Sequence, residues 1–128
     1  MPRAMPAKVV DASALAALLF GEPDGAKIAK RLEGARLIAP SLLPYELANT
    51  CLVKVRRHSA QREAILAAHG LLRNLALDVL EVDFDEVLGL AEETGLSAHD
   101  ASYLWLARSL DAELVTLDKR LAAHLAIR

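Results

Sequence analysis

The sequence predicts an α/β fold in which a mostly parallel sheet of four or five strands is flanked by helices on both faces. Short apolar segments alternate along the chain with longer segments rich in Ala and Leu, which is typical of strands alternating with helices. Hydrophobic residues make up 54% of the chain and aromatic residues only 4%, so small aliphatic side chains must build the core. The length of 128 residues is that of one domain, and we expect residues 1–128 to form a single domain.

The first half of the chain is expected to contain two buried strands and three helices. The expected ranges are 8–11 and 36–39 for the strands and 13–20, 25–33 and 44–58 for the helices. Gly21 and Pro23 break the first helix, and Gly34 ends the second. Pro44 suits a first helical turn, because its missing N–H would have no partner there in any case.

The second half continues the alternation. The expected strands are 79–82 and 113–117, and helices are expected at 60–74, after Asp83 or Asp85, after Ser97 and at 119–125. Ser97 to Asp100 has the Ser-x-x-Asp form of a capping box, which predicts a helix start. Gly95 ends the helix before it.

Charge and cysteine content exclude several classes of protein. The net charge of −2 argues against a protein that coats nucleic acid through positive charge alone. Cys51 is the single cysteine, which excludes an internal disulfide and a Cys-rich zinc site, and we expect it to be a buried helix residue. Asp11 interrupts the N-terminal apolar stretch and argues against a secretion signal. No uncharged apolar run reaches the ~18 residues that span a bilayer, so we expect a cytoplasmic protein with no membrane partner.

Four acidic residues stand where strands end or helices begin. Asp11 ends the first strand and Asp118 follows the last, while Glu46 and Asp100 lie in the first turns of two helices. Ligands of this fold class bind beyond the carboxyl ends of the strands, so we expect these acids to share one crevice. Two carboxylates ~5 Å apart repel by roughly 3 kcal/mol at an effective dielectric constant of ~20, and a cation between them relieves the repulsion. Oxygen ligands favour Mg²⁺ or Mn²⁺, and such sites readily hydrolyse phosphodiesters.

Each acid also has a purely structural explanation. Asp100 completes a capping box, and Glu46 interacts favourably with a helix dipole. Asp11 and Asp118 suit N-cap positions after strands. Spacing alone does not decide between caps and metal ligands.

The segments around the four acids resemble those of PIN-domain ribonucleases, especially the VapC-type toxins of bacterial and archaeal toxin–antitoxin systems. The matching segments are, in order, VVDASAL (9–15), PSLLPYELAN (40–49), GLSAHDASY (95–103) and LVTLDKRL (114–121). The resemblance covers nearly the whole chain, and GLSAHDASY is its most specific segment. It implies a three-layer PIN-like fold and a metal-dependent endoribonuclease.

The resemblance also implies roles for individual residues. Metal binding and water activation fall to the four acids, Asp11, Glu46, Asp100 and Asp118, with Mg²⁺ or Mn²⁺ as the ion. Three polar residues are expected beside the metal as auxiliary groups: Ser13, Thr116 and Asn49. The implied partners are an RNA substrate, a cognate antitoxin and a second copy of the chain in a homodimer. The apolar face of the helices within 25–58 is the expected contact for the antitoxin or the second copy.

Some features depart from the pattern or leave alternatives open. Such domains often finish with a glycine-led strand, whereas residues 123–128 contain no glycine, so a fifth strand is expected to be absent or very short. An aspartate-nucleophile phosphatase would need an acid at position 13, where Ser13 stands. The remaining alternatives are a PIN-like binding module without catalysis and a PIN nuclease that is not a toxin.

The chain also contains a basic stretch and a few aromatic residues outside these motifs. The basic stretch consists of Lys54, Arg56, Arg57, His58 and Arg62, and it is either a guide for RNA phosphates or a solvated helix end. Tyr103 and Trp105 are expected in the core rather than as base-stacking platforms. His99 is expected to be structural or exposed.

Overall fold

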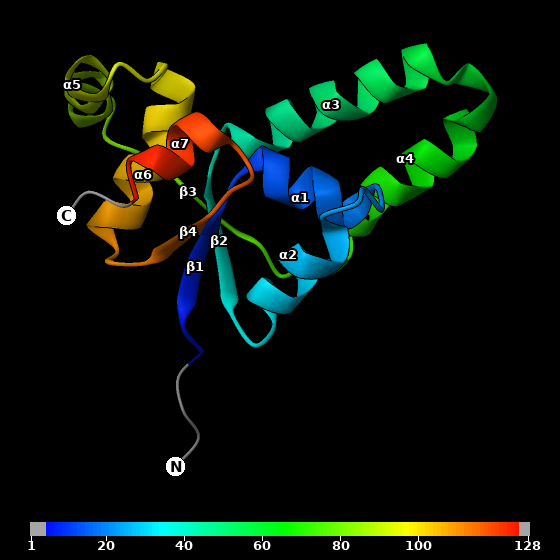
Figure 1. Cartoon of the computed structure of the whole chain (residues 1–128), viewed down its shortest axis with the longest axis horizontal. Helices are drawn as coiled ribbons and strands as arrows, with labels where there is room; N and C mark the ends of the chain where they lie inside the picture. Colours follow the sequence, from blue (N-terminus) through cyan, green and yellow to red (C-terminus); the bar gives the residue numbers. More distant parts are fainter. Residues whose placement is uncertain (1–4, 126–128) are drawn as a thin grey trace.

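The computed structural model describes residues 5–125, which form one sheet of four parallel strands flanked by helices (Figure 1). The strands are β1 (Ala7–Val10), β2 (Arg36–Pro40), β3 (Asp78–Leu80) and β4 (Glu113–Val115). Their order across the sheet is β3-β2-β1-β4, and every pair is parallel. The predicted α/β class with a parallel sheet is therefore confirmed.

The helices follow the expected order, with one interruption. They are α1 (Ala12–Leu19), α2 (Gly25–Leu32), α3 (Leu43–Arg57), α4 (Arg62–Gly70), α5 (Phe84–Thr94), α6 (Ala98–Ser109) and α7 (Lys119–Ala123). The helix expected over 60–74 is instead α4 between two 3₁₀ turns, η1 (Ser59–Gln61) and η2 (Leu71–Asn74). No residue of α4 is fully buried, and a helix with little tertiary packing lacks the main source of stability for a longer helix.

Helices cover both sides of the sheet. Helix α6 packs against β1, β2 and β4, and α5 packs against α6. Helix α1 packs against α2 and α3. Figure 1 shows α5, α6 and α7 on one side of the strands and α1 and α2 on the other, while the hairpin of α3 and α4 projects away from the sheet.

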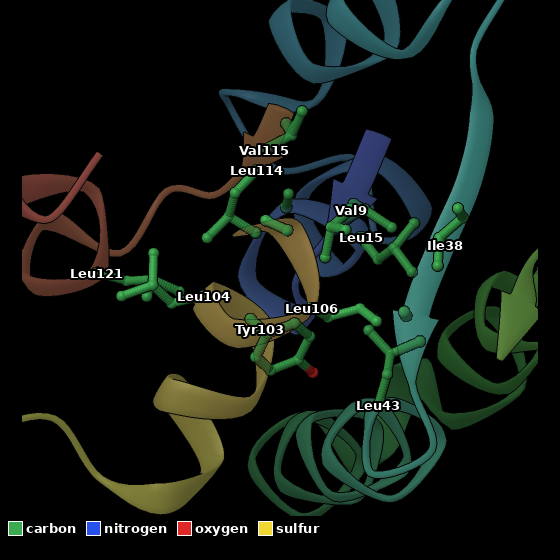
Figure 2. Close-up of a cluster of buried hydrophobic side chains, with 14 of the residues drawn as sticks. Val9, Leu15, Ile38, Leu43, Tyr103, Leu104, Leu106, Leu114, Val115 and Leu121 are labelled. Atoms are coloured by element: carbon green, nitrogen blue, oxygen red, sulfur yellow. The ribbon is translucent and has the colours of Figure 1, made fainter. Parts of the chain in front are cut away.

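The core is built from aliphatic side chains of the central strands and the helices that cover them. Figure 2 shows Val9, Ile38 and Leu114 of the sheet among Leu15, Leu43, Leu104 and Leu121 of the helices, and all of them are almost completely buried. Each such side chain contributes roughly 1.5–3 kcal/mol by leaving water. Cys51 is buried without a disulfide, as expected.

The C-terminal end of the sheet differs from the sequence expectation. Strand β4 ends at Val115, two residues earlier than expected, because the N–H groups of Leu117 and Asp118 bond to side-chain hydroxyls. Leu117 N–H donates to Ser13 Oγ and Asp118 N–H donates to Thr116 Oγ1. Up to Leu125 no strand follows β4, and positions 126–128 of the expected fifth strand lie outside the described residues. Within 5–125, no helix combines the length and apolarity that crossing a bilayer requires.

Candidate active site

The four acids named from the sequence line one open cleft of about 400 Å³. Asp11 and Asp118 are the N-caps of α1 and α7, directly after β1 and three residues after the end of β4. Glu46 and Asp100 lie in the first turns of α3 and α6. Four elements that are distant in sequence thus bring their carboxylates to a single edge of the sheet.

Strand pairing fixes two of these elements against each other. Val10 is in register with Val115, and Asp11 N–H donates to Val115 O at 3.2 Å, which extends the pairing by one residue. Asp11 and Thr116 therefore leave the sheet together. Thr116 Oγ1 donates to Asp11 Oδ2 at 2.5 Å.

Asp11 is held by three hydrogen bonds although it is only 5% exposed. Its Oδ1 accepts from Ser13 Oγ at 2.7 Å and from the Ala14 N–H at 3.0 Å, while Oδ2 accepts from Thr116. Burial raises the pKa of Asp11; these three hydrogen bonds lower it in part, and the nearby charge of Asp118 raises it further. Asp11 is both a helix cap and a cleft acid.

The hydroxyls of Ser13 and Thr116 have fixed directions. Each accepts a backbone N–H, Ser13 from Leu117 at 3.0 Å and Thr116 from Asp118 at 2.9 Å. Since a hydroxyl carries a single proton, each hydroxyl donates it to Asp11. Two of the three predicted auxiliary residues thus orient Asp11 by direct contact.

Glu46 is half-buried and bonded to α6. Its Oε1 accepts a 2.5 Å hydrogen bond from the Tyr103 hydroxyl. Burial raises the pKa of Glu46; the Tyr103 bond and His99 lower it, and the charges of Asp100 and Asp11 raise it. Burial and the neighbouring Glu46 also raise the pKa of the Tyr103 phenol, which therefore stays protonated as a donor.

Tyr103 is the clearest cleft residue that the sequence did not single out. Its ring is buried among core side chains (Figure 2), as expected, but Tyr103 also lines the cleft, where its hydroxyl donates to Glu46. The available signal was its position one helical turn after Asp100, on the same face of α6. His99 is exposed, in line with expectation.

Asp118 is both a helix cap and a cleft residue, whereas Asp100 lines the cleft beside the cap that Ser97 supplies. Ser97 Oγ accepts the Asp100 N–H at 3.1 Å, so Ser97 caps α6 while the Asp100 side chain lines the cleft. Asp118 Oδ1 accepts from the N–H groups of Arg120 and Leu121 at 2.8 and 3.1 Å. Both bonds end on the same oxygen, which leaves Oδ2 for a ligand.

The structure does not bring Asn49 to the cleft. Asn49 is exposed on α3, and the neighbouring Thr50 lines the cleft in its place, with its hydroxyl bonded to Glu46 O at 3.1 Å. Glu22, between α1 and α2, is a further lining acid that the sequence did not single out, because it lies in a turn without a recognisable pattern. Its Oε2 is 2.8 Å from Lys54 Nζ.

The donor chemistry of the cleft suits a hard divalent cation. Its candidate ligands are carboxylate oxygens, which Mg²⁺ and Mn²⁺ prefer. Across residues 5–125, no three His, Cys, Asp or Glu side chains are arranged to ligate one ion directly. Mg²⁺ is usually bound through one or two carboxylates and keeps several waters, and an open cleft has room for that arrangement.

Comparisons with known proteins agree along almost the whole chain. A family model described as PIN domain matches residues 8–126. Ribonuclease VapC9 of Mycobacterium tuberculosis is 36% identical over 119 residues, which are 89% of this chain and 87% of that protein. Ribonuclease VapC3 of Pyrobaculum aerophilum is 34% identical over 122 residues, 89% and 91% of the two chains.

Two solved structures share the fold. PAE2754 from Pyrobaculum aerophilum superposes with a TM-score of 0.75 at 31% identity, over 92% of this chain and 84% of that chain. Mycobacterium tuberculosis VapC20 gives a TM-score of 0.65 at 20% identity, over 92% and 95%. The sheet with flanking helices is therefore the three-layer arrangement of these proteins.

Proposed function

The chain belongs to the PIN-domain family, in its VapC-like group, and from this premise we propose that it is the ribonuclease toxin of a toxin–antitoxin pair. The observation that carries the proposal is the convergence of Asp11, Glu46, Asp100 and Asp118 on one cleft. Relatives named VapC ribonucleases, which match over 89% of the chain, support it. The proposed reaction is hydrolysis of RNA phosphodiester bonds inside the strand, with Mg²⁺ or Mn²⁺ as cofactor.

In the proposed mechanism, the residues of the chain place charge and protons around the phosphate. Asp11 and Asp118 would hold the ion, with Glu46 and Asp100 as further ligands through water. A bound Mg²⁺ or Mn²⁺ lowers the pKa of a coordinated water and neutralises charge on the phosphate. Ser13 and Thr116 keep the Asp11 carboxylate in one orientation. Tyr103 donates to Glu46 Oε1, and Glu46 Oε2 would accept the proton of the attacking water.

We also propose that the antitoxin covers the hairpin of α3 and α4. Leu52 and Val53 of α3 and Leu66 of α4 are exposed, and α4 contributes no fully buried residue. Apolar side chains grouped on one projecting hairpin favour contact with a partner. The homodimer and the cytoplasmic location stay predictions.

The proposal is tested with purified protein and RNA. A circular single-stranded RNA, which is cut only inside the strand, is incubated with Mg²⁺, Mn²⁺ or EDTA. We expect linear products with either ion and none in EDTA. Asp11→Asn should lower the cleavage rate at least about 100-fold, because it alters a ligand whose outer-shell partners alone are typically worth 10–100-fold.

Other outcomes separate the alternatives. Cleavage at the parent rate by folded Asp11→Asn would refute the assignment of Asp11. No cleavage with either ion, together with no metal-induced stabilisation, would favour a PIN-like binding module. A nuclease that is not a toxin would cleave RNA in vitro but would not arrest growth when it is expressed. Its neighbouring gene would encode no small DNA-binding protein.

A further inference from the structure

The structure divides the basic stretch that the sequence left unassigned. Lys54 and His58, four residues apart at the end of α3, both line a second pocket of about 340 Å³. Arg56 and Arg57 are exposed and do not line this pocket, and Arg62 lines a separate depression on η1 and α4. Two of the five basic residues thus share one concave surface.

This second pocket adjoins the acidic cleft through an ion pair. Glu22 lines the cleft, Lys54 lines the second pocket, and Lys54 Nζ lies 2.8 Å from Glu22 Oε2. Lys54 also lies over the ring of Phe20, with Nζ 5.3 Å from the ring centroid. The Glu22–Lys54 pair therefore stands at the boundary between the two hollows.

The negative charge of the cleft would repel RNA phosphates, so RNA binding requires a positive group near this boundary. RNA carries a phosphate at every nucleotide, and five acids, including Glu22, line the cleft. A bound ion offsets that charge at the scissile phosphate, whereas the next phosphate along the strand requires another positive group. Lys54 presents one at the rim.

The ion pair is suited to exchange its carboxylate for a phosphate. The Lys54 and Glu22 side chains are 30% and 35% exposed, and partly exposed pairs of this kind are weak. A lysine ammonium is a compact charge with three donors and can turn to an incoming phosphate without a set geometry. His58, one turn further along, adds a second donor, and Phe20 and Ile65 add apolar surface for a sugar or base.

We propose that Lys54, assisted by His58, binds the RNA phosphate next to the scissile one, and that Glu22 positions the Lys54 ammonium until the strand arrives. This inference rests on the proposed function and names the path of the substrate beyond the acidic cleft. The occupant is the backbone of single-stranded RNA.

The test compares Lys54→Ala with Arg56→Ala, a matched loss of one positive charge on the same helix two residues away. Cleavage kinetics give KM and kcat, and fluorescence anisotropy gives the Kd for a single-stranded RNA on the Asp11→Asn background with Mg²⁺. Lys54→Ala should raise KM and Kd about tenfold, as the loss of one charge-assisted contact does, with little change in kcat. It should also reduce the slope of log K against log salt by about 0.7, the contribution of one phosphate in a single strand. Arg56→Ala should change KM, Kd and the salt slope much less.

A double-mutant cycle tests the role of Glu22. Glu22→Gln should lower KM in the parent protein, because Lys54 is then released from its carboxylate. In the Lys54→Ala background the same change should lower KM clearly less, because only the general loss of a negative charge remains. An equal gain in both backgrounds would show that Glu22 acts only as a general negative charge and would overturn its role as the Lys54 partner that the phosphate displaces.

The remaining outcomes distinguish the subsite from the nuclease itself. If the parent protein cleaves RNA while Lys54→Ala and Arg56→Ala behave alike in KM, Kd and salt slope, the subsite is wrong and the proposed function stands. If the parent protein neither cleaves nor binds RNA with either ion, both proposals fail.

Discussion

At the scale of single residues, Asp11 is the acid whose geometry is set most completely. Three hydrogen bonds reach its two oxygens, and two of the donors are hydroxyls whose own lone pairs accept backbone N–H groups. Rotation of the carboxylate would break bonds on both sides of the cleft. Such preorganisation is what aligns a ligand oxygen with a metal ion.

Thr116→Val tests this orientation. Valine keeps the shape of threonine but removes both the donor to Asp11 and the acceptor of the Asp118 N–H. We expect the cleavage rate at limiting Mg²⁺ to fall 10–100-fold, as for other outer-shell partners of metal ligands. The partly buried Asp118 N–H left without a partner should lower the free energy of unfolding by at most about 1–3 kcal/mol.

Thr116→Ser is the matched control, since it restores the hydroxyl and loses only a methyl group. Its metal dependence should stay close to that of the parent. Parent-like cleavage by Thr116→Val at every Mg²⁺ concentration would show that the hydroxyl does not serve the site.

At the scale of elements, the cleft is assembled from helix starts. Helices α1, α3, α6 and α7 each contribute an acid at the N-cap or in the first turn. The hydrogen bond from Tyr103 to Glu46 joins α6 to α3 across 57 positions of sequence. This bond holds the Glu46 side chain against α6.

Tyr103→Phe tests the link between α3 and α6. The ring stays in the core, so the fold should be retained, while the free energy of unfolding falls by at most about 1.5–3 kcal/mol, the range for a hydrogen bond to a charged group. Cleavage should fall roughly 10-fold or more because Glu46 loses its fixed direction. Circular dichroism, thermal unfolding and cleavage of the same RNA provide the measurements. Unchanged kcat and KM would limit Tyr103 to a packing role.

At the scale of the whole molecule, the buried acids link stability to pH. Burial raises the pKa of Asp11 from its ordinary value of 3.8 and that of Glu46 from 4.5. A carboxyl with a raised folded pKa stabilises the fold fully below its unfolded pKa, and this contribution is lost as pH rises through the folded pKa. The bond from Arg31 lowers the pKa of Glu113, which contributes in the opposite direction.

We therefore expect the stability of the parent and of Asp11→Asn to depend differently on pH, as measured by thermal unfolding from pH 4 to pH 8. In EDTA, the parent should lose stability relative to Asp11→Asn as pH rises, because Asn at position 11 cannot ionise. At neutral pH, Mg²⁺ should stabilise the parent by about 2.7 kcal/mol at a hundred times its Kd, and the variant much less. Parallel pH profiles in EDTA would contradict a raised pKa for Asp11.

Local features of the sequence determined much of the fold. Strand β1, helix α1 and the caps Asp83 and Ser97 were predictable, because apolar periodicity and capping bonds involve residues within a few positions of one another. The same reasoning marked Asp11 and Asp118 at the ends of strands. The spacing of the residues did not decide whether each carboxylate is a helix cap or a metal ligand. In the structure, Asp118 caps α7 through Oδ1 and keeps Oδ2 for a ligand.

The tertiary structure decided what depends on distant contacts. It placed β1 between β2 and β4, brought Tyr103 to Glu46 and Glu22 to Lys54, and turned Thr50 rather than Asn49 to the cleft. It also ended β4 early, since hydroxyls from α1 and the following loop took the N–H groups that the strand would have used. These outcomes depend on how helices rotate and settle against the sheet, which is fixed by packing over the whole core rather than by neighbouring residues.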